Sequence, residues 1–279
     1  MRRADLARLV TLAAIWGASF LFMRIAAPAL GPAATANLRM LIAGVALAAV
    51  FAWSGFDPQW RRWAGQYFLV GAFNSAAPFL LFAYAALELS AGTMSIINAT
   101  SPIFAALLSV LFLGERLAVR RAAGLVLGIA GVGLVSKPSG GSAIAVSAAL
   151  GASFSYALSA VYLRRWARDV PSRGMAVGTQ FAGGALLVPF SIAYPPAAVP
   201  GAAIWLNVLA LGLLCSALAY LLYFRLIADI GATRALSVTY LIPAFGLLWG
   251  ALFLGEQVSP AVLAGAALVI AGTALVLRG

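Results

Sequence analysis

Side chains that could carry out catalysis are sparse in this sequence. It has no histidine, and Cys215 is the only cysteine. A disulfide needs a second cysteine, and a His general base, a Cys–His nucleophile pair or a His/Cys metal site needs histidine or more cysteines. We therefore expect no enzymatic activity, no catalytic residue, no metal site and no cofactor. Cys215 is interpreted as a small packing residue.

Two carboxylates stand out because they recur in the same short segment. The residues "LFLGE" occupy positions 111–115 and again positions 252–256. Glu115 and Glu256 each follow an apolar run, and the other acidic residues also lie at the ends of apolar runs or between them. A proton antiporter needs a titratable group inside the membrane, and none stands out here. We predict that both glutamates cap or brace helix ends; the alternative is that they are gate groups that change partners between two states.

The composition predicts that a bilayer surrounds most of the chain. Of the 279 residues, 64% are hydrophobic and only 9% are charged, and the mean hydropathy is +1.03. A soluble domain carries about 25% charged residues, whereas a membrane-spanning helix needs about 20 mainly apolar residues. We predict ten spans, near residues 6–27, 34–54, 66–87, 92–113, 118–136, 142–163, 175–194, 204–225, 234–254 and 259–277. The fifth span has the shortest charge-free core.

The distribution of positive charge predicts how the chain is oriented. Fifteen of the 18 Lys and Arg residues fall at the termini or in loops on one side of the predicted spans. Lys137 alone lies on the other side, while Arg24 and Arg39 lie within spans. By the positive-inside rule, both termini are cytoplasmic, as in a multi-pass protein of a bacterial-type inner membrane. The net charge of +11 lies in short loops between apolar segments, so we expect no nucleic-acid partner. The basic N-terminus is typical of a signal peptide, but we expect the first segment to remain as a span.

An internal repeat divides the chain into two halves. Residues 91–135 match residues 232–276 at an offset of 141, pairing Pro102 with Pro243 and Gly114 with Gly255. The segment "GASF" at 17–20 recurs at 151–154. We place the two halves at residues 1–137 and 138–279. Five helices per half is an odd number, so the second half must be upside down relative to the first. The predicted fold is an all-α polytopic membrane protein with ten transmembrane helices, arranged as two inverted five-helix repeats around a central cavity. Secondary transporters use this arrangement, with the substrate site near the membrane midplane.

Polar residues within the spans mark a candidate substrate site. Unpaired polar groups are costly in lipid, so such residues tend to face protein or a water-filled cavity. In the fourth span, Ser95, Asn98 and Ser101 recur every three residues and Pro102, which removes a backbone hydrogen bond, follows them. The full candidate set, which also includes aromatic wall residues, is Asn74, Ser75, Pro78 and Phe79 in the third span, Ser95, Asn98, Ser101 and Pro102 in the fourth, Ser216, Tyr220 and Tyr223 in the eighth, and Thr239, Tyr240 and Pro243 in the ninth. Gln180 and Trp16 are weaker candidates. The alternative is ordinary helix packing, in which Ser, Thr and Asn bond across helices.

The sequence resembles a known transporter family in several segments. "IWGASFLFMRIA", "LRMLIAG" and "FLGERLAVRRAAGLVLGIAGVGLV" are similar to the ten-helix EamA-type proteins of the drug/metabolite transporter superfamily. Within it the chain looks most like the YddG-type amino-acid exporters. The resemblance implies a central cavity between two five-helix repeats. It also implies that Arg24 and Arg39, which lie toward the outer ends of their spans, are architectural residues. Their long stems would let the charges reach the outer interface.

The leading hypothesis is a secondary-type transporter that exports small neutral or aromatic amino acids from the cytoplasm by alternating access. The expected partners are a small-molecule substrate and the lipid bilayer, and the sequence is compatible with a monomer. One alternative is a multidrug or other small-metabolite exporter. Small cation exporters of the superfamily use a glutamate in the first helix, whereas this chain has Trp16, Gly17 and Ser19 and no acid there. A structural or sensory membrane protein is a further alternative.

Overall fold

The computed structural model describes residues 2–116, 118–136, 141–196 and 198–278, which form helices joined by short connections. The first half contains α1 (Arg3–Leu30), α2 (Pro32–Trp53), α3 (Trp60–Gly71), the π-helical segment η1 (Ala72–Ala76), α4 (Ala77–Ala85), α5 (Ala91–Asn98), α6 (Ser101–Leu113) and α7 (Val119–Ser136). The second half contains α8 (Ala143–Trp166), α9 (Ser172–Ala193), α10 (Ala202–Gly212), the π-helical segment η2 (Leu213–Leu218), α11 (Ala219–Ile230), α12 (Ala232–Ala235), α13 (Val238–Leu254) and α14 (Pro260–Arg278).

The prediction of an all-α membrane protein with ten spans is confirmed. Within the described residues, nine helical runs are long and apolar enough to cross a membrane, and α13 is a tenth, shorter apolar helix of 17 residues. Three of the nine runs combine several elements, namely Trp60–Ala85, Ala91–Leu113 and Ala202–Ile230. The fifth span, the one with the shortest apolar core, forms as α7.

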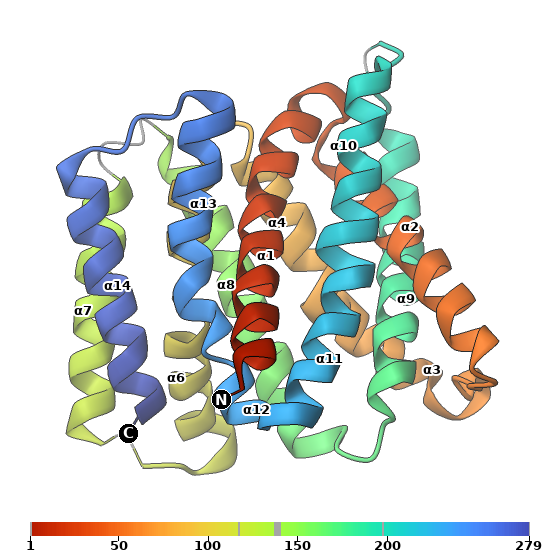
Figure 1. The fold of residues 1–279 in the computed structure, drawn as a ribbon, viewed down its shortest axis with the longest axis horizontal. Helices are drawn as coiled ribbons and strands as arrows, with labels where there is room; N and C mark the ends of the chain where they lie inside the picture. Colours follow the sequence, from red (N-terminus) through yellow and green to blue (C-terminus); the bar gives the residue numbers. More distant parts are fainter. Residues whose placement is uncertain (1, 117, 137–140, 197, 279) are drawn as a thin grey trace.

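Both termini lie at the same end of the molecule (Figure 1). We refer to this end as the inner face and to the opposite end as the outer face. Because five crossings separate the start of α1 from the start of α8, the second half enters from the outer face and is inverted. The predicted boundary between residues 137 and 138 falls outside the described residues, as does Lys137.

The repeated "LFLGE" segment forms the same helix end twice. Gly114 and Gly255 follow the last residues of α6 and α13 with φ angles of 68° and 65°. This left-handed conformation favours glycine, and it lets the N–H groups of Gly114 and Gly255 bond back to Ser109 and Gly250. One copy lies at the inner face and the other at the outer face.

Close glycine contacts join the last helix of each half. A Cβ atom on Gly124 would lie 2.5 Å from the carbonyl oxygen of Gly272, and one on Gly131 would lie 2.7 Å from that of Gly265. Small residues allow such close approach between membrane helices, where dispersion contacts replace the hydrophobic drive. The α7–α14 pair therefore forms a tight unit at one side of the molecule (Figure 1).

The fourth span differs from the continuous helix predicted for residues 92–113. It breaks between α5 and α6 at Ala99 and Thr100, and Pro102 is the second residue of α6, where a missing N–H is tolerated. Hydroxyl groups satisfy the carbonyls freed at the break. Ser101 Oγ donates to the Asn98 carbonyl at 2.8 Å, and Thr273 Oγ1 of α14 donates to that of Ala99 at 2.7 Å.

Candidate functional site

The two π-helical segments hold polar residues in the middle of the third and eighth spans. η1 and η2 begin 141 residues apart, so they occupy equivalent positions in the repeats. A π-bulge widens one helical turn and is frequent at functional sites. η1 presents Asn74 and Ser75, and η2 presents Ser216. Both serines are buried, and Asn74 is half-buried.

Hydrogen bonds connect η1 to the second half of the chain. Asn74 Nδ2 lies 3.5 Å from Tyr220 Oη, and Ser75 also bonds Tyr220. Gln180 Nε2 donates to Ser75 Oγ at 3.1 Å. Gln180 is fully buried, and its Oε1 atom has no hydrogen-bond partner among the described residues.

Arg39 joins the same cluster from α2. Its Nε donates to Ser216 Oγ at 2.9 Å, and its guanidinium lies 3.7 Å above the centre of the Phe79 ring. The hydroxyls of Tyr156 and Tyr220 lie close enough to interact electrostatically with this guanidinium. We name this group the polar cluster: Arg39, Asn74, Ser75, Tyr156, Gln180, Ser216 and Tyr220.

Apolar and aromatic side chains border the polar cluster. Pro78 is buried at the start of α4, one residue before Phe79. Tyr223 lies one turn beyond Tyr220 in α11, and its ring centre is 5.3 Å from that of Trp16. The predicted residues of the third and eighth spans thus lie close to the polar cluster or within it.

The predicted residues of the fourth and ninth spans mostly bond their own helices. Ser95 Oγ donates to the Gly92 carbonyl at 2.7 Å, and a Cβ on Gly246 of α13 would collide with it. Thr239 Oγ1 donates to the Leu236 carbonyl at 2.8 Å. Among the described residues, Asn98, Ser101 and Pro102 are half-buried and make no side-chain hydrogen bond to the polar cluster. Tyr240 is half-buried, and Pro243 is buried within α13. Their role in substrate binding stays a prediction.

The expectation that Arg39 extends to the outer interface is wrong. Arg39 is only 5% exposed, and it donates hydrogen bonds to η2 and not to groups at a helix end. From its position within the span, the long side chain of Arg39 could extend either to the outer interface or into the protein interior. Gln180 and Tyr156 also belong to the cluster more clearly than sequence reasoning indicated; a polar or phenolic residue inside an apolar run was the only signal for them.

Arg24 has a different environment. Its Nη1 donates to the carbonyl oxygens of Ala86 and Leu87 at 2.7 and 3.0 Å, just after the C-terminal end of α4. A cation is favourable there because carbonyls at a helix C-terminus lack intrahelical partners. These bonds support the prediction that Arg24 is architectural.

The two repeated glutamates make different contacts. Glu256 accepts the backbone N–H groups of Ala91 and Gly92, at 2.9 and 3.4 Å, and so caps the N-terminus of α5 at the outer face. Glu115 at the inner face instead pairs with Arg121 and Arg164, each at 2.8 Å. The hydrogen bonds from Arg121 and then Arg164 hold the pKa of Glu115 below its usual value.

Helix packing also differs between the two faces. α5, the outer half of the fourth span, packs on α13, which ends at the outer face. α6, the inner half of the fourth span, packs on α8 instead. The fourth and ninth spans therefore close together near the outer face, while nearer the inner face the fourth span turns to a different neighbour.

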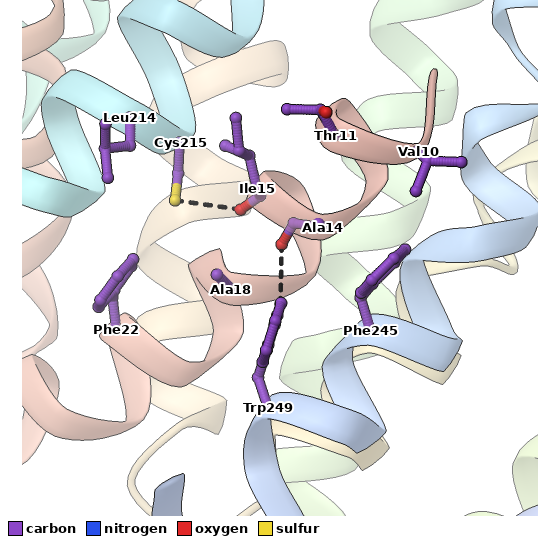
Figure 2. A pocket seen from close by; sticks show the side chains of 10 residues that line it. All are labelled: Val10, Thr11, Ala14, Ile15, Ala18, Phe22, Leu214, Cys215, Phe245 and Trp249. Carbon is purple, nitrogen blue, oxygen red and sulfur yellow. Dashed lines mark hydrogen bonds between the residues drawn. The ribbon is translucent and has the colours of Figure 1, made fainter. Parts of the chain in front are cut away.

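A groove of about 380 Å³ opens beside the cluster, between α1, η2 and α13 (Figure 2). Trp249 Nε1 and Cys215 Sγ donate to backbone oxygens of α1 along its walls. Its lining is almost entirely apolar and it is open to the side, so it suits surrounding lipid better than a polar substrate. Among the described residues, no three His, Cys, Asp or Glu side chains gather in a way that could hold a metal ion.

Comparisons with known proteins agree with this architecture. A probable terminal-alkyne amino-acid exporter of Streptantibioticus cattleyicolor is 29% identical over 97% of this chain and 92% of its own length. The uncharacterized transporter YvbV of Bacillus subtilis is 30% identical over 96% of this chain and 90% of its own length. A crystal structure with a TM-score of 0.69 and 23% identity covers 99% of this chain and 96% of that one, which shows the same fold. The model of the EamA-like transporter family matches residues 6–137 and again 143–278. The chain therefore belongs to the EamA-like transporter family.

Proposed function

We propose that this family member exports small neutral or aromatic amino acids from the cytoplasm by alternating access through the region of the polar cluster. The observation that carries the proposal is the pairing of η1 and η2. At equivalent positions of two inverted repeats, they supply hydrogen-bonding side chains deep within the spans. Inverted repeats that meet at a polar midplane are the general design of alternating-access carriers.

The difference between the two faces supports the alternating-access part of the proposal. If the two repeats exchange their conformations, contacts now made at the outer face would form at the inner face. The closed α5–α13 contact and the Glu256 cap fit a state in which the outer side is shut.

The composition of the cluster supports the substrate class. Hydroxyl, amide and guanidinium groups suit a small molecule with charged and hydrogen-bonding ends, and Phe79 and Tyr223 offer surface to an apolar side chain. The name of the relative from S. cattleyicolor points to the same class.

Flux measurements test the proposal. The purified protein is reconstituted in liposomes, and efflux of labelled L-phenylalanine, L-leucine, L-alanine and L-threonine is measured with and without a pH gradient. We expect saturable flux for at least one of them. Asn74→Ala combined with Tyr220→Phe should reduce that flux at least tenfold, because the double variant removes two side chains that can hydrogen-bond the cargo and each such bond is worth ~1 kcal/mol.

Asn207→Ala is the matched control. Asn207 lies in the same span as Tyr220, but its side chain donates to the Ala203 carbonyl of its own helix. It should leave flux unchanged. Absence of saturable flux for all four amino acids in the wild-type protein would refute the amino-acid assignment.

A further inference from the structure

Arg39 carries a positive charge deep within the protein and within the membrane span. It is the eighth residue of α2, which begins at Pro32, so it lies about 10 Å along the helix axis from the outer end. This is about a third of the way into a hydrocarbon core that is ~30 Å thick. An arginine side chain does not lose its proton in proteins, so the charge persists there.

Every described partner of this guanidinium is neutral. Nε donates to Ser216 Oγ at 2.9 Å, and Nη2 reaches the Cys215 carbonyl only at 3.5 Å. Nη1 has the thioether sulfur of Met23 at 3.9 Å, which is a weak acceptor. The Nη1 and Nη2 edge of the guanidinium is therefore poorly satisfied.

All seven acidic side chains of the chain lie elsewhere and do not pair with Arg39. Asp5, Asp229 and Glu115 pair with arginines near the inner face, and Glu256 and Glu88 bond backbone N–H groups near the outer face. Asp57 and Asp169 lie in connections between helices. None of the described ion pairs involves Arg39, although buried charges in membrane proteins are normally paired.

Gln180 adds a complementary feature. Its amide is buried, and with Nε2 given to Ser75 its oxygen has no donor among the described residues. Ser75 and Arg39 are both neighbours of Tyr220, so the unsatisfied acceptor and the unpaired cation belong to one connected group. An ammonium group would satisfy the Gln180 oxygen, and a carboxylate would pair with the Arg39 guanidinium.

We propose that Arg39 is the residue that recognises the carboxylate of the cargo, so that the carrier selects small carboxylates and discriminates against esters and amides of the same shape. This inference rests on the proposed function and deepens it. The guanidinium presents a planar fork of donors that a carboxylate can accept in bidentate fashion, which lysine cannot reproduce. Bound cargo supplies the negative charge that the protein lacks at this depth.

Binding to the purified full-length protein in detergent tests the inference without requiring transport. Three probes separate the two charged ends of the cargo: L-phenylalanine, its methyl ester, and 3-phenylpropanoate, which has no ammonium group. Wild-type protein should bind L-phenylalanine about 10- to 100-fold more tightly than the ester, since a hydrogen bond to a charged group is being lost. This comparison within the wild type needs no variant to fold.

The variants then assign the discrimination to Arg39. Arg39→Gln should abolish the preference for acid over ester, and Arg39→Lys should leave an intermediate preference. Arg24→Gln is the matched control, because Arg24 also lies within a span but bonds backbone carbonyls. It should keep the wild-type preference.

The outcomes separate this inference from the proposed function. Equal binding of acid and ester by the wild type, a preference retained by Arg39→Gln, or no binding of either carboxylate overturns the role of Arg39. Binding and flux of amino acids could still stand in the first two cases. Arg39-dependent binding of 3-phenylpropanoate without binding of L-phenylalanine supports the role of Arg39 in binding a carboxylate. It also points to a different carboxylate as the transported molecule.

Discussion

Removing the Glu256 carboxylate should weaken the closure of the outer face. In the structure Glu256 lies in the connection between α13 and α14 and accepts the first two N–H groups of α5. It thereby links the ninth span to the fourth across the boundary between the repeats. Glu256→Ala deletes this link and leaves the N-terminus of α5 to water.

The geometry sets the size of the effect. The bond to Ala91 N is 2.9 Å long and counts fully, while the bond to Gly92 N is 3.4 Å long and contributes little. A hydrogen bond to a charged group is worth about 1.5–3 kcal/mol. Because Glu256 is half-exposed, we reduce this to about 1–2 kcal/mol, which corresponds to a shift of about 5- to 30-fold toward an outward-open population.

A single reporter cysteine measures the opening. Cys215→Ala removes the native thiol, and Ser95→Cys places a new one in the α5–α13 contact, where Ser95 is fully buried against Gly246. Intact cells are treated with a membrane-impermeant maleimide, and the labelling rate is followed. Glu256→Ala should raise that rate about 5- to 30-fold over the parent, in line with the population shift.

Glu88→Ala supplies the matched control. Glu88 also lies near the outer face and accepts the N–H of Ser142 at 2.7 Å, but it links α4 to α8, which pack together without involving α13. Its removal should leave the labelling of the reporter cysteine unchanged. If Glu256→Ala labels at the parental rate, or if Glu88→Ala accelerates labelling equally, the reasoning about the outer closure is refuted.

Three further predictions follow from the repeat, from the packing of α7 on α14 and from the charge distribution. Glu115 is the repeat equivalent of Glu256, so in the opposite state it should cap the N-terminus of α12. Glu115→Ala should therefore slow labelling of the same reporter cysteine, because the exposed ion pairs that it loses in the present state are worth only ~0–1 kcal/mol. Faster labelling would contradict the equivalence. Gly131→Val should destabilise the protein by about 1–3 kcal/mol because a Cβ meets the Gly265 carbonyl at 2.7 Å, whereas Gly133→Val, which has open space, should not; thermal unfolding in detergent compares the two. A fluorescent protein fused to the C-terminus should fluoresce and an alkaline phosphatase fused there should be inactive, as the positive-inside rule predicts for a cytoplasmic C-terminus; an active phosphatase would reverse the orientation.

The spans and their repeat could be predicted because hydropathy, charge and residue identity are encoded locally. Each predicted apolar run is helical in the structure, three of them as several consecutive helical elements, and a glycine ends the helix in both "LFLGE" segments. The direction of individual side chains could not be predicted in the same way. Ser95 faces α13 and Arg39 faces η2 because of how the helices rotate and cross, which a single sequence pattern does not fix. The break at Ala99 and Thr100 depends in part on a hydroxyl from α14, far along the chain.

The contact between α7 and α14 has a consequence for biosynthesis. α7 packs mainly on α14, yet about 120 residues of chain separate them, so α14 leaves the ribosome well after α7. Until then, the face of α7 that carries Gly124 and Gly131 has only lipid to contact. During synthesis, the first half is therefore in the bilayer while α7 still lacks its main packing partner, α14. Truncation within α14 should leave a protein vulnerable to membrane quality control even though the polar cluster is intact in sequence.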